Sequence, residues 1–225
     1  MLPISIIIPS YEEPIETLIK TVDQFINYDN IEVIISDSSL KKIPEKTDFK
    51  KENVSIVYST KKNISAGRNI GAKHASNDIV IFLDADVVIE DIPKTLEYIN
   101  KHINTCGCII LKMSLPKDVS KNAVDKLKNK FFCKLVNLRM RVYKYGRGEC
   151  IITKKQIFNK VGGFDETKNV AEDSDLTKKL GEIKFPNLYY IESGRRILTL
   201  GWIKMLKEWN LNHLNQTREW EPIGR

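Results

Sequence analysis

Two aspartates, Asp84 and Asp86, follow directly on a run of five apolar residues over 79–83. The run consists of β-branched residues, one phenylalanine and one leucine, is too short to indicate a helix, and therefore predicts a buried strand. Two carboxylates separated by one residue at a strand end offer hard oxygen ligands to a divalent cation, which could in turn hold a diphosphate. The structural alternative is that Asp84 caps a turn and Asp86 is solvated, and for an isolated Asp-x-Asp pair this alternative is favoured.

A second group of carboxylates, Glu172, Asp173 and Asp175, stands at the start of a predicted helix over 173–180. Acidic residues in a first helical turn interact favourably with the helix dipole, so the group has a structural explanation as well as a chemical one. Taken alone, the pattern favours the structural explanation.

The elements that must position these residues alternate along the first half of the chain. The predicted strands are 5–9, 31–35, 54–58, 79–83 and 107–113, and the predicted helices between them are 15–28, 66–75 (with Ser65 as its N-cap) and 92–102. Strands that read as solid apolar runs and alternate with helices predict a mostly parallel sheet covered on both faces. Ligands gather at the carboxyl ends of such strands, so the segment ends near Tyr11, Asp37 and Asp84 are expected to converge on one crevice.

The second half follows a different pattern. A long basic amphipathic helix is predicted over 119–145, with one break left open. The further predicted elements are a strand over 149–153, a helix over 154–161, a tight turn over 162–166, a strand over 188–192 and a helical tail over 197–214. No internal repeat or linker is visible, so we expect one domain over 1–225, with halves at 1–113 and 114–225.

The amino-acid composition limits the classes of protein to which the chain could belong. Of the 225 residues 42% are hydrophobic and 29% are charged, which is typical of a soluble globular chain. No apolar run approaches the roughly 20 residues that span a bilayer, and the N-terminus lacks a basic leader, so a cytoplasmic protein is expected. The four cysteines show no zinc-like spacing and are expected to be reduced thiols.

The positive charge behind the net value of +7 is concentrated in one segment, because residues 117–160 hold thirteen Lys or Arg and three acidic residues. The apolar stripe of the helix over 119–145 and its lysines could lie against an anionic bilayer as a peripheral contact. The alternative, that the stripe packs into the core and the lysines are solvated, is the one that the pattern favours.

Several stretches, taken together and in order, resemble the family 2 glycosyltransferases of the GT-A fold. They are ISIIIPSYEE, IISDSS, SAGRNIGAKHA, FLDAD, GRGECIITKKQIFNKVGGFDE, AEDSDL and SGRR followed by a glycine and a tryptophan. The resemblance covers nearly the whole chain and implies an α/β fold with a Rossmann-like central sheet and a smaller acceptor-side region. It also implies transfer of a sugar, with inversion, from a UDP- or GDP-sugar to an acceptor hydroxyl or lipid phosphate.

The resemblance implies roles for the two carboxylate groups. Asp86, with Asp84 on the ribose or the metal, would hold Mg²⁺ or Mn²⁺ and stabilise the leaving nucleoside diphosphate. Asp173 would accept the proton of the attacking hydroxyl, with Glu172 as a helper. Asp175 is expected to face solvent or support the helix start. His213 is a candidate third metal ligand, although an exposed surface position is favoured for it.

The resemblance also implies contacts to the donor and acceptor. Residues implied to bind the nucleotide sugar are Pro9, Tyr11, Glu13, Asp37, Arg68, Ala85, Arg195 and Arg196. Those implied to form the acceptor-side wall are Gly148, Glu149, Gly162 and Gly163. The structural alternatives are a strand-end turn for Asp37, a helix-surface salt bridge for Arg68 and tight turns for the glycines.

Two other function classes stay open. A sugar-phosphate nucleotidyltransferase would need a glycine-rich phosphate loop after the first strand, where Pro9-Ser10-Tyr11-Glu12-Glu13 has no glycine. A non-catalytic basic protein that binds nucleic acid or a membrane surface is allowed by the pI near 9.1. The chain has no visible nucleic-acid motif, and its acidic sites would repel phosphate unless loaded with metal, so no nucleic acid is expected as a partner. The expected partners are a nucleotide-sugar donor and a glycan, lipid-linked or protein acceptor.

Overall fold

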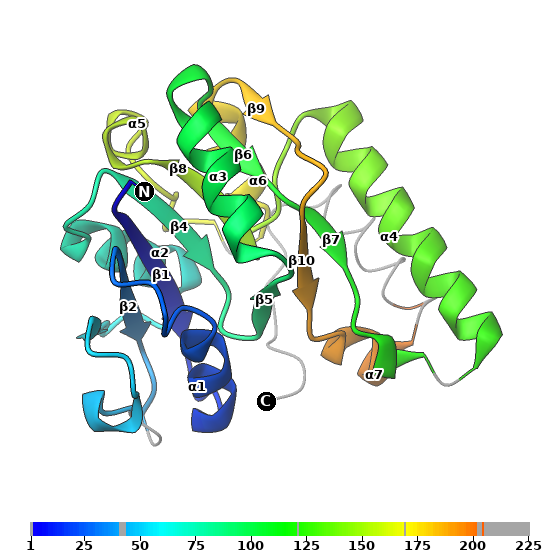
Figure 1. The fold of residues 1–225 in the computed structure, drawn as a ribbon, viewed down its shortest axis with the longest axis horizontal. Helices are drawn as coiled ribbons and strands as arrows, with labels where there is room; N and C mark the ends of the chain where they lie inside the picture. Colours follow the sequence, from blue (N-terminus) through cyan, green and yellow to red (C-terminus); the bar gives the residue numbers. More distant parts are fainter. Residues whose placement is uncertain (1, 41–43, 121, 169, 202–203, 205–225) are drawn as a thin grey trace.

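The computed structural model describes residues 2–40, 44–120, 122–168, 170–201 and 204 (Figure 1). A seven-stranded sheet in the order β3-β2-β1-β4-β8-β6-β9 forms its centre. The strands are β1 (Ile4–Ser10), β2 (Ile31–Asp37), β3 (Val54–Tyr58), β4 (Ile79–Leu83), β6 (Cys108–Ile110), β8 (Cys150–Lys154) and β9 (Ile183–Lys184). All neighbours pair in parallel except β8, which runs antiparallel to β4 and to β6. The predicted α/β class with a mostly parallel sheet is confirmed.

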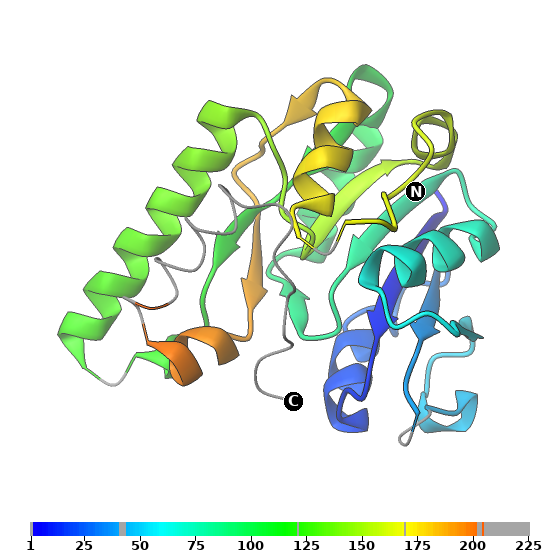
Figure 2. The same ribbon diagram turned by 180° about the vertical axis from the view of Figure 1, so that it is seen from behind.

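Helices cover both faces of this sheet because its central strands are apolar on both sides. The helices are α1 (Ile15–Asp23), α2 (Ile64–His74), α3 (Ile92–His102), α4 (Ala123–Tyr143), α5 (Lys155–Lys160), α6 (Glu172–Leu180) and α7 (Arg195–Leu200). Helices α1 and α3 lie on the face seen in Figure 1, and α2 and α6 lie on the opposite face seen in Figure 2. Every residue of β4 is buried, which explains its solid apolar run.

A second, three-stranded sheet in the order β5-β10-β7 extends the molecule toward α4 (Figure 1). Its strands are β5 (Val87–Ile89), β7 (Lys112–Ser114) and β10 (Tyr189–Glu192). The single strand predicted over 107–113 is therefore wrong. The chain passes from one sheet to the other at the buried Leu111, which lies between β6 and β7. A continuous apolar run does not indicate where a strand changes its pairing partner.

Three helix boundaries differ from the prediction. The helix expected over 15–28 ends at Asp23, and three-residue turns then close through hydrogen bonds such as Phe25 N–H to Val22 O (2.9 Å). Asn63 rather than Ser65 caps α2, accepting from the amide of Ala66 at 3.2 Å. Helix α4 is unbroken but shorter than 119–145, and Asn122 caps it.

The remaining elements lie within a residue or two of the prediction, and a short 3₁₀ turn, Lys117–Val119, precedes α4. Among the described residues no helix is long and apolar enough to cross a membrane. The single tail helix predicted over 197–214 is wrong where the structure describes it, because α7 begins at Arg195 and ends at Leu200, before Gly201 with its φ of 72°. The positions 202–203 and 205–214 lie outside the described residues, as do His213 and the Arg196 side chain.

Candidate active site

Acidic side chains meet at one edge of the central sheet. Parallel β1, β2 and β4 all end there, so the segments near Tyr11, Asp37 and Asp84 converge as predicted. Because β8 is antiparallel, it begins at the same edge, and the amide of Asp84 donates to the carbonyl of Glu149 at 3.1 Å. The edge therefore combines the carboxyl ends of three strands with the start of a fourth.

Arg68 of α2 is the buried cation of the site, with only 1% of its residue surface exposed. Its guanidinium donates to Asp84 Oδ1 (2.7 Å) and to Glu172 Oε1 (3.1 Å), and it stacks over the ring of Phe164 at 5.0 Å. The structural alternative for Arg68, a salt bridge on the helix surface, is wrong in its location, because the arginine forms a buried bridge between the two carboxylate groups. Its expected contact with the nucleotide sugar stays a prediction. Loss of solvent raises the pKa of Asp84 to about 6, against the opposing charge of Arg68.

Gly148 is required by this arrangement. Its carbonyl accepts from Arg68 Nη2 at 3.0 Å, and a Cβ atom at this position would lie 2.6 Å from the same nitrogen. Any side chain would displace the guanidinium from Asp84 or from Glu172. The glycine expected at the acceptor-side wall therefore serves close packing against Arg68.

Asp173 is held by backbone amides. Its carboxylate accepts from the amide of Gly148 at 2.8 Å and from that of Ser174 at 2.6 Å. Burial first, and then the charge of Glu149, raise the pKa of Asp173, while Arg68 and the two amides oppose the shift. No side-chain cation among the described residues forms an ion pair with it.

Glu172 and Asp173 are presented by an unusual helix start. Ala171, immediately before α6, has a φ of 61°, in the left-handed region that non-glycine residues rarely adopt. Burial and the neighbouring Asp173 raise the pKa of Glu172 to about 7, although Arg68 lowers it. Asp175 points to two lysines instead, Lys168 at 2.9 Å and Lys179 at 2.7 Å, as expected of a residue that supports the helix start.

Asp86 forms hydrogen bonds with a different set of residues. Its Oδ2 accepts from Ser193 Oγ at 2.5 Å and from Arg195 Nη2 at 2.8 Å. Arg195 also binds Glu13, and each carboxylate oxygen of Glu13 lies 3.2 Å from a guanidinium nitrogen. Thr21 of α1 donates to the carbonyl of Ala85 at 2.5 Å and so fixes the loop between the two aspartates.

The acceptor-side residues form a third cluster. Arg147 is in contact with Glu149, and its guanidinium lies 3.2 Å from Glu192 Oε2. Burial acts against the charge of Arg147, but these two carboxylates hold its pKa well above the usual value. Glu149 Oε2 is buried and has no hydrogen-bond partner among the described residues.

At the other end of the edge, the buried carboxylate of Asp37 accepts from the amide (3.1 Å) and the hydroxyl (2.8 Å) of Ser39. Tyr11 lies under Lys62, whose Nζ is 5.8 Å from the ring centroid. Pro9 lies in β1, one residue before its end. These residues form an aromatic and acidic group at the ends of β1 and β2, on the same edge of the sheet as Asp84.

Sequence reasoning gave no role to several residues that hold the site. Asn69 accepts from the amide of Phe164 (2.9 Å) and donates to its carbonyl (2.9 Å), which fixes the turn after Gly163. Gly163 itself has a φ of 72°, and its Cβ would lie 2.8 Å from Asn69 Oδ1. The role of Asn69 could have been suspected from its position beside Arg68 in the sequence. Arg147 and Ser193 lie in the stretches GRGEC and SGRR that carry the family resemblance, but neither was given a role, and nothing in the local pattern marked Thr21.

The donor set at Asp86 fits a divalent cation that retains waters and takes substrate oxygens. Asp86 Oδ1 has no hydrogen-bond partner among the described residues, whereas Oδ2 is taken by Ser193 and Arg195. Within the described ranges no group of three or more His, Cys, Asp or Glu residues could hold a metal ion. A cation such as Mg²⁺ typically uses one or two carboxylates with waters and phosphate oxygens, so two aspartates suffice only with a bound diphosphate.

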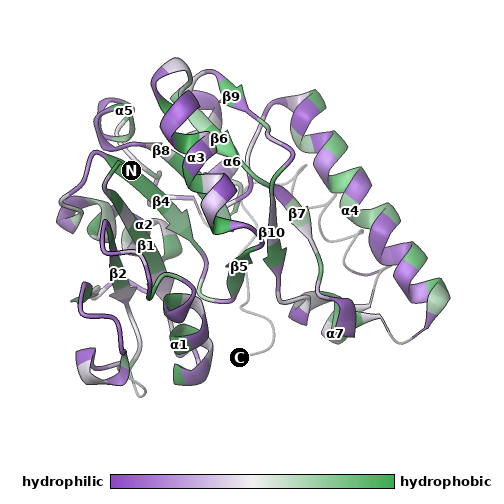
Figure 3. Ribbon diagram, viewed as in Figure 1, coloured by the Kyte–Doolittle hydropathy of each residue, from purple (hydrophilic) through white to green (hydrophobic). Residues whose placement is uncertain are grey.

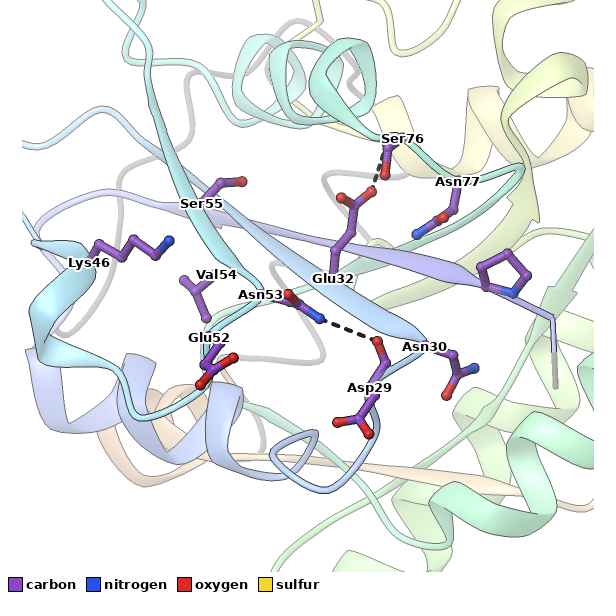
Figure 4. A pocket seen from close by; sticks show the side chains of 11 residues that line it. Asp29, Asn30, Glu32, Lys46, Glu52, Asn53, Val54, Ser55, Ser76 and Asn77 are labelled. Carbon is purple, nitrogen blue, oxygen red and sulfur yellow. Dashed lines mark hydrogen bonds between the residues drawn. The ribbon is translucent and has the colours of Figure 1, made fainter.

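A hollow of about 460 Å³ opens at the opposite edge of the sheet, where β2 and β3 begin (Figure 4). Two of its side chains bind backbone groups of other residues that line it, since Glu32 accepts from the amide of Ser76 at 2.7 Å and Asn53 donates to the carbonyl of Asp29 at 3.2 Å. The acidic residues at the carboxyl edge take no part in it. The hollow is therefore separate from the candidate site.

Comparisons with known proteins agree with this geometry. The chain spans 61% of an uncharacterized glycosyltransferase of Haemophilus influenzae, with 23% identity over 79% of its own length. It is 38% identical over 88 residues to an uncharacterized glycosyltransferase of Rickettsia bellii, which is 37% of this chain and 13% of that protein. It therefore covers less than two thirds of either relative.

Solved structures share the fold. The mannosyltransferase PcManGT from Pyrobaculum calidifontis, in complex with GDP-Man and Mn²⁺, matches 93% of this chain and 64% of its own, with a TM-score of 0.63 and 18% identity. TarS of S. aureus (residues 1–349) in complex with UDP matches 97% of this chain and 67% of its own, with a TM-score of 0.58 and 17% identity. These likenesses confirm the expected GT-A-like fold.

The family model described as glycosyl transferase family 2 matches residues 5–162. That range includes β1, the acidic pair at 84 and 86, Arg68, Gly148 and Glu149, and it spans more than half of the chain. The chain belongs to glycosyl transferase family 2.

Proposed function

We propose that this protein transfers a sugar from a nucleotide diphosphate sugar to an acceptor, with inversion at the anomeric carbon. The observation that carries the proposal is the pair of carboxylate sets at one sheet edge, bridged by Arg68: an arginine-bound Asp86 on one side and an amide-bound Asp173 on the other. An inverting displacement needs a leaving-group site and a base on opposite sides of the sugar ring. The two sets supply one of each.

The leaving-group side is assigned to Asp84, Asp86 and Arg195. A divalent cation, Mg²⁺ or Mn²⁺, held by Asp86 with Asp84 would neutralise the negative charge that develops on the departing diphosphate. Arg195 now bridges Glu13 and Asp86, and its planar fork suits a phosphate that exchanges for one of these carboxylates. Pro9, Tyr11 and Asp37 would lie along the nucleoside.

Asp173 is assigned as the base. The two amide donors orient its carboxylate, while burial raises its pKa and so makes it a stronger proton acceptor than an exposed aspartate. Arg68 would keep Glu172 and Asp84 apart from the acceptor by holding both carboxylates in place. Glu149 and Gly148 would form the wall beside the acceptor hydroxyl or lipid phosphate.

The proposal also assigns the two halves of the chain, as one domain, to the two substrates. Residues 1–113 contribute Asp37, Arg68 and the 84–86 loop, whereas 114–225 contribute Gly148, Glu149 and α6. One continuous set of buried apolar residues joins both halves, which supports a single unit. The donor half and the acceptor half then meet at Arg68.

The decisive experiment is a donor panel. The protein is incubated with Mn²⁺, GDP-mannose and a set of UDP-sugars, and the release of nucleoside diphosphate is measured with and without candidate acceptors. We expect release with one donor, and we expect proton NMR of the fresh product to show the opposite anomeric configuration. Formation of nucleoside triphosphate and sugar 1-phosphate when inorganic pyrophosphate is added to the donor would instead indicate a nucleotidyltransferase. A retained configuration would contradict inversion. Asp175→Asn is the matched control because Asp175 pairs with lysines outside the site.

A further inference from the structure

Helix α4 has two apolar faces, and only one of them is packed against the protein. Phe132, Val136 and Met140 are buried on the inner face. Asn137 joins that face to the second sheet, because its amide accepts from Met113 N–H at 2.8 Å and donates to Met113 O at 2.9 Å. The side-chain amide thus takes the place of a neighbouring strand at the edge formed by β7.

The outer face carries the apolar stripe that the sequence pattern assigned to the core. Its members are Val124, Leu127, Phe131, Leu135, Leu138 and Val142, with exposures of 60%, 69%, 68%, 40%, 59% and 63%. Their spacing of three and four residues places them in one row along five turns of the helix. At about 100° per residue this row is roughly opposite the buried face. The expectation that the stripe packs into the core was wrong for these six residues, because periodicity detects a row but not which row faces inward. Tyr145, the seventh residue of the predicted stripe, follows the helix and is buried.

The charges around the stripe indicate what it would contact. Basic side chains flank it on both sides of the helix, with Lys128 on one flank and Lys130, Lys134 and Arg141 on the other, all exposed. Between residues 122 and 144 the only acidic residue is Asp125. Figure 3 shows the helix at the outer edge of the molecule, with hydrophobic and hydrophilic segments alternating along it. An apolar row with a row of cations along one flank and Lys128 on the other is complementary to acyl chains beneath anionic headgroups.

We propose that the outer face of α4 docks on an anionic lipid bilayer. The helix would lie in the plane of the interface, with the stripe inserted and the flanking lysines on the headgroups. A water-soluble protein partner is a poorer match, because a row of exposed apolar residues flanked by cations over five helical turns needs an acidic partner of matching length. Gly148 is the fifth residue after the end of α4, so a docked helix would hold the acceptor-side wall close to the membrane.

The proposal is tested by flotation of the full chain with two kinds of vesicle. One kind contains phosphatidylcholine only, and the other also contains phosphatidylglycerol. We expect binding to the anionic vesicles that falls with added salt, and little binding to the neutral ones. No binding to anionic vesicles, or binding that neither lipid charge nor salt alters, would overturn the proposal.

Matched variants separate the two contributions. Phe131→Glu should lower vesicle binding more than tenfold, whereas Leu40→Glu, at a comparable exposure of 65% outside α4, should leave it unchanged. Lys128→Gln with Lys134→Gln should lower binding about 25-fold, roughly fivefold for each charge. Lys20→Gln with Lys101→Gln, both exposed on other helices, should have a much smaller effect.

Self-association is the competing explanation for the stripe. Sedimentation equilibrium without lipid should give a monomer, both for the unmodified chain and for Phe131→Glu. A dimer that Phe131→Glu dissociates, together with equal vesicle binding by both proteins, would overturn the proposal. Because the vesicle assay does not depend on sugar transfer, its outcome is independent of the proposed function.

Discussion

The two carboxylate sets of the site are built from the same residue types but differ in what holds them. Asp86 is bound by a guanidinium and a hydroxyl, so its negative charge is neutralised by a cation for which a diphosphate could compete. Asp173 is bound by two backbone amides, which orient it without supplying a full positive charge. Under the proposed function, partner type rather than residue type would separate the electrostatic role of Asp86 from the base role of Asp173.

The largest expected effect is on the base side. Asp173→Asn keeps the size of the side chain but removes the proton acceptor, so turnover should fall about 10²- to 10⁴-fold. Donor affinity, measured by calorimetric titration of the nucleotide, should stay within about twofold because the leaving-group side is untouched. Asp175→Asn should change neither quantity. Retained turnover in Asp173→Asn would place the base elsewhere.

The bridge between the two sets should matter most for stability. Arg68→Met leaves Asp84 and Glu172 without their shared cation, which should lower the free energy of unfolding by about 3–5 kcal/mol. Urea denaturation measures this change. Lys61→Met removes an exposed ion pair with Glu166 and should cost about 0.5 kcal/mol or less. Equal effects of the two substitutions would show that Arg68 is not the buried bridge.

A substitution on the leaving-group side should lower the affinity for the nucleotide. Asp86→Asn removes the carboxylate that would face the cation, so the Mn²⁺-dependent affinity for nucleoside diphosphate should fall by about one to two orders of magnitude. Titrations with and without Mn²⁺ measure the effect, with Asp175→Asn as control. An unchanged affinity in the presence of Mn²⁺ would contradict the metal role of Asp86.

Glu172 should make stability depend on pH. Its pKa is raised to about 7 in the folded chain, so the folded state binds more protons than the unfolded state between about pH 4.5 and 7. Stability due to Glu172 is therefore present below this window and is lost as pH rises through it, by up to about 1.4 kcal/mol per pH unit. Glu172→Gln should flatten this slope in urea denaturation series across that range. A slope unchanged by the substitution would rule Glu172 out as its source.

The smallest effect concerns the loop between the two aspartates. Thr21→Val removes the donor to the carbonyl of Ala85 and leaves that buried carbonyl unpaired, at a cost of about 1 kcal/mol. Thermal denaturation measures the loss. Thr199→Val, at an exposed hydroxyl of α7, is the control and should cost less. If both variants unfold at the same temperature as the unmodified protein, the Thr21 hydrogen bond does not support the loop.

Much of the fold could be predicted because local patterns specify it. The apolar runs at 54–58 and 79–83 and the amphipathic pattern at 92–102 match β3, β4 and α3 residue for residue. Solid runs bounded by turn residues leave little choice of element. The prediction of one strand over 107–113 failed because this run contains two strands, whose partners lie about 40 and about 80 residues further along the chain. No local pattern specifies such a distant pairing.

The acidic residues of the candidate site were visible in the sequence, whereas their partners were not. Asp84, Asp86, Glu172 and Asp173 follow an apolar run or begin a helix, and each could be picked from its own neighbourhood. The burial of Arg68 and its bridge to Glu172 join residues 104 positions apart, so only the tertiary structure could reveal them.

The sequence by itself determined the alternation of strands and helices, the acidic strand end and the basic apolar helix, because each is a local or periodic property. Only the tertiary structure decided that β8 runs antiparallel and brings Gly148 and Glu149 to the edge beside Asp84. It also decided that the outer row of α4 stays exposed while the opposite row is buried. Strand direction and helix rotation follow from contacts between distant segments, and these contacts leave no local trace in the chain.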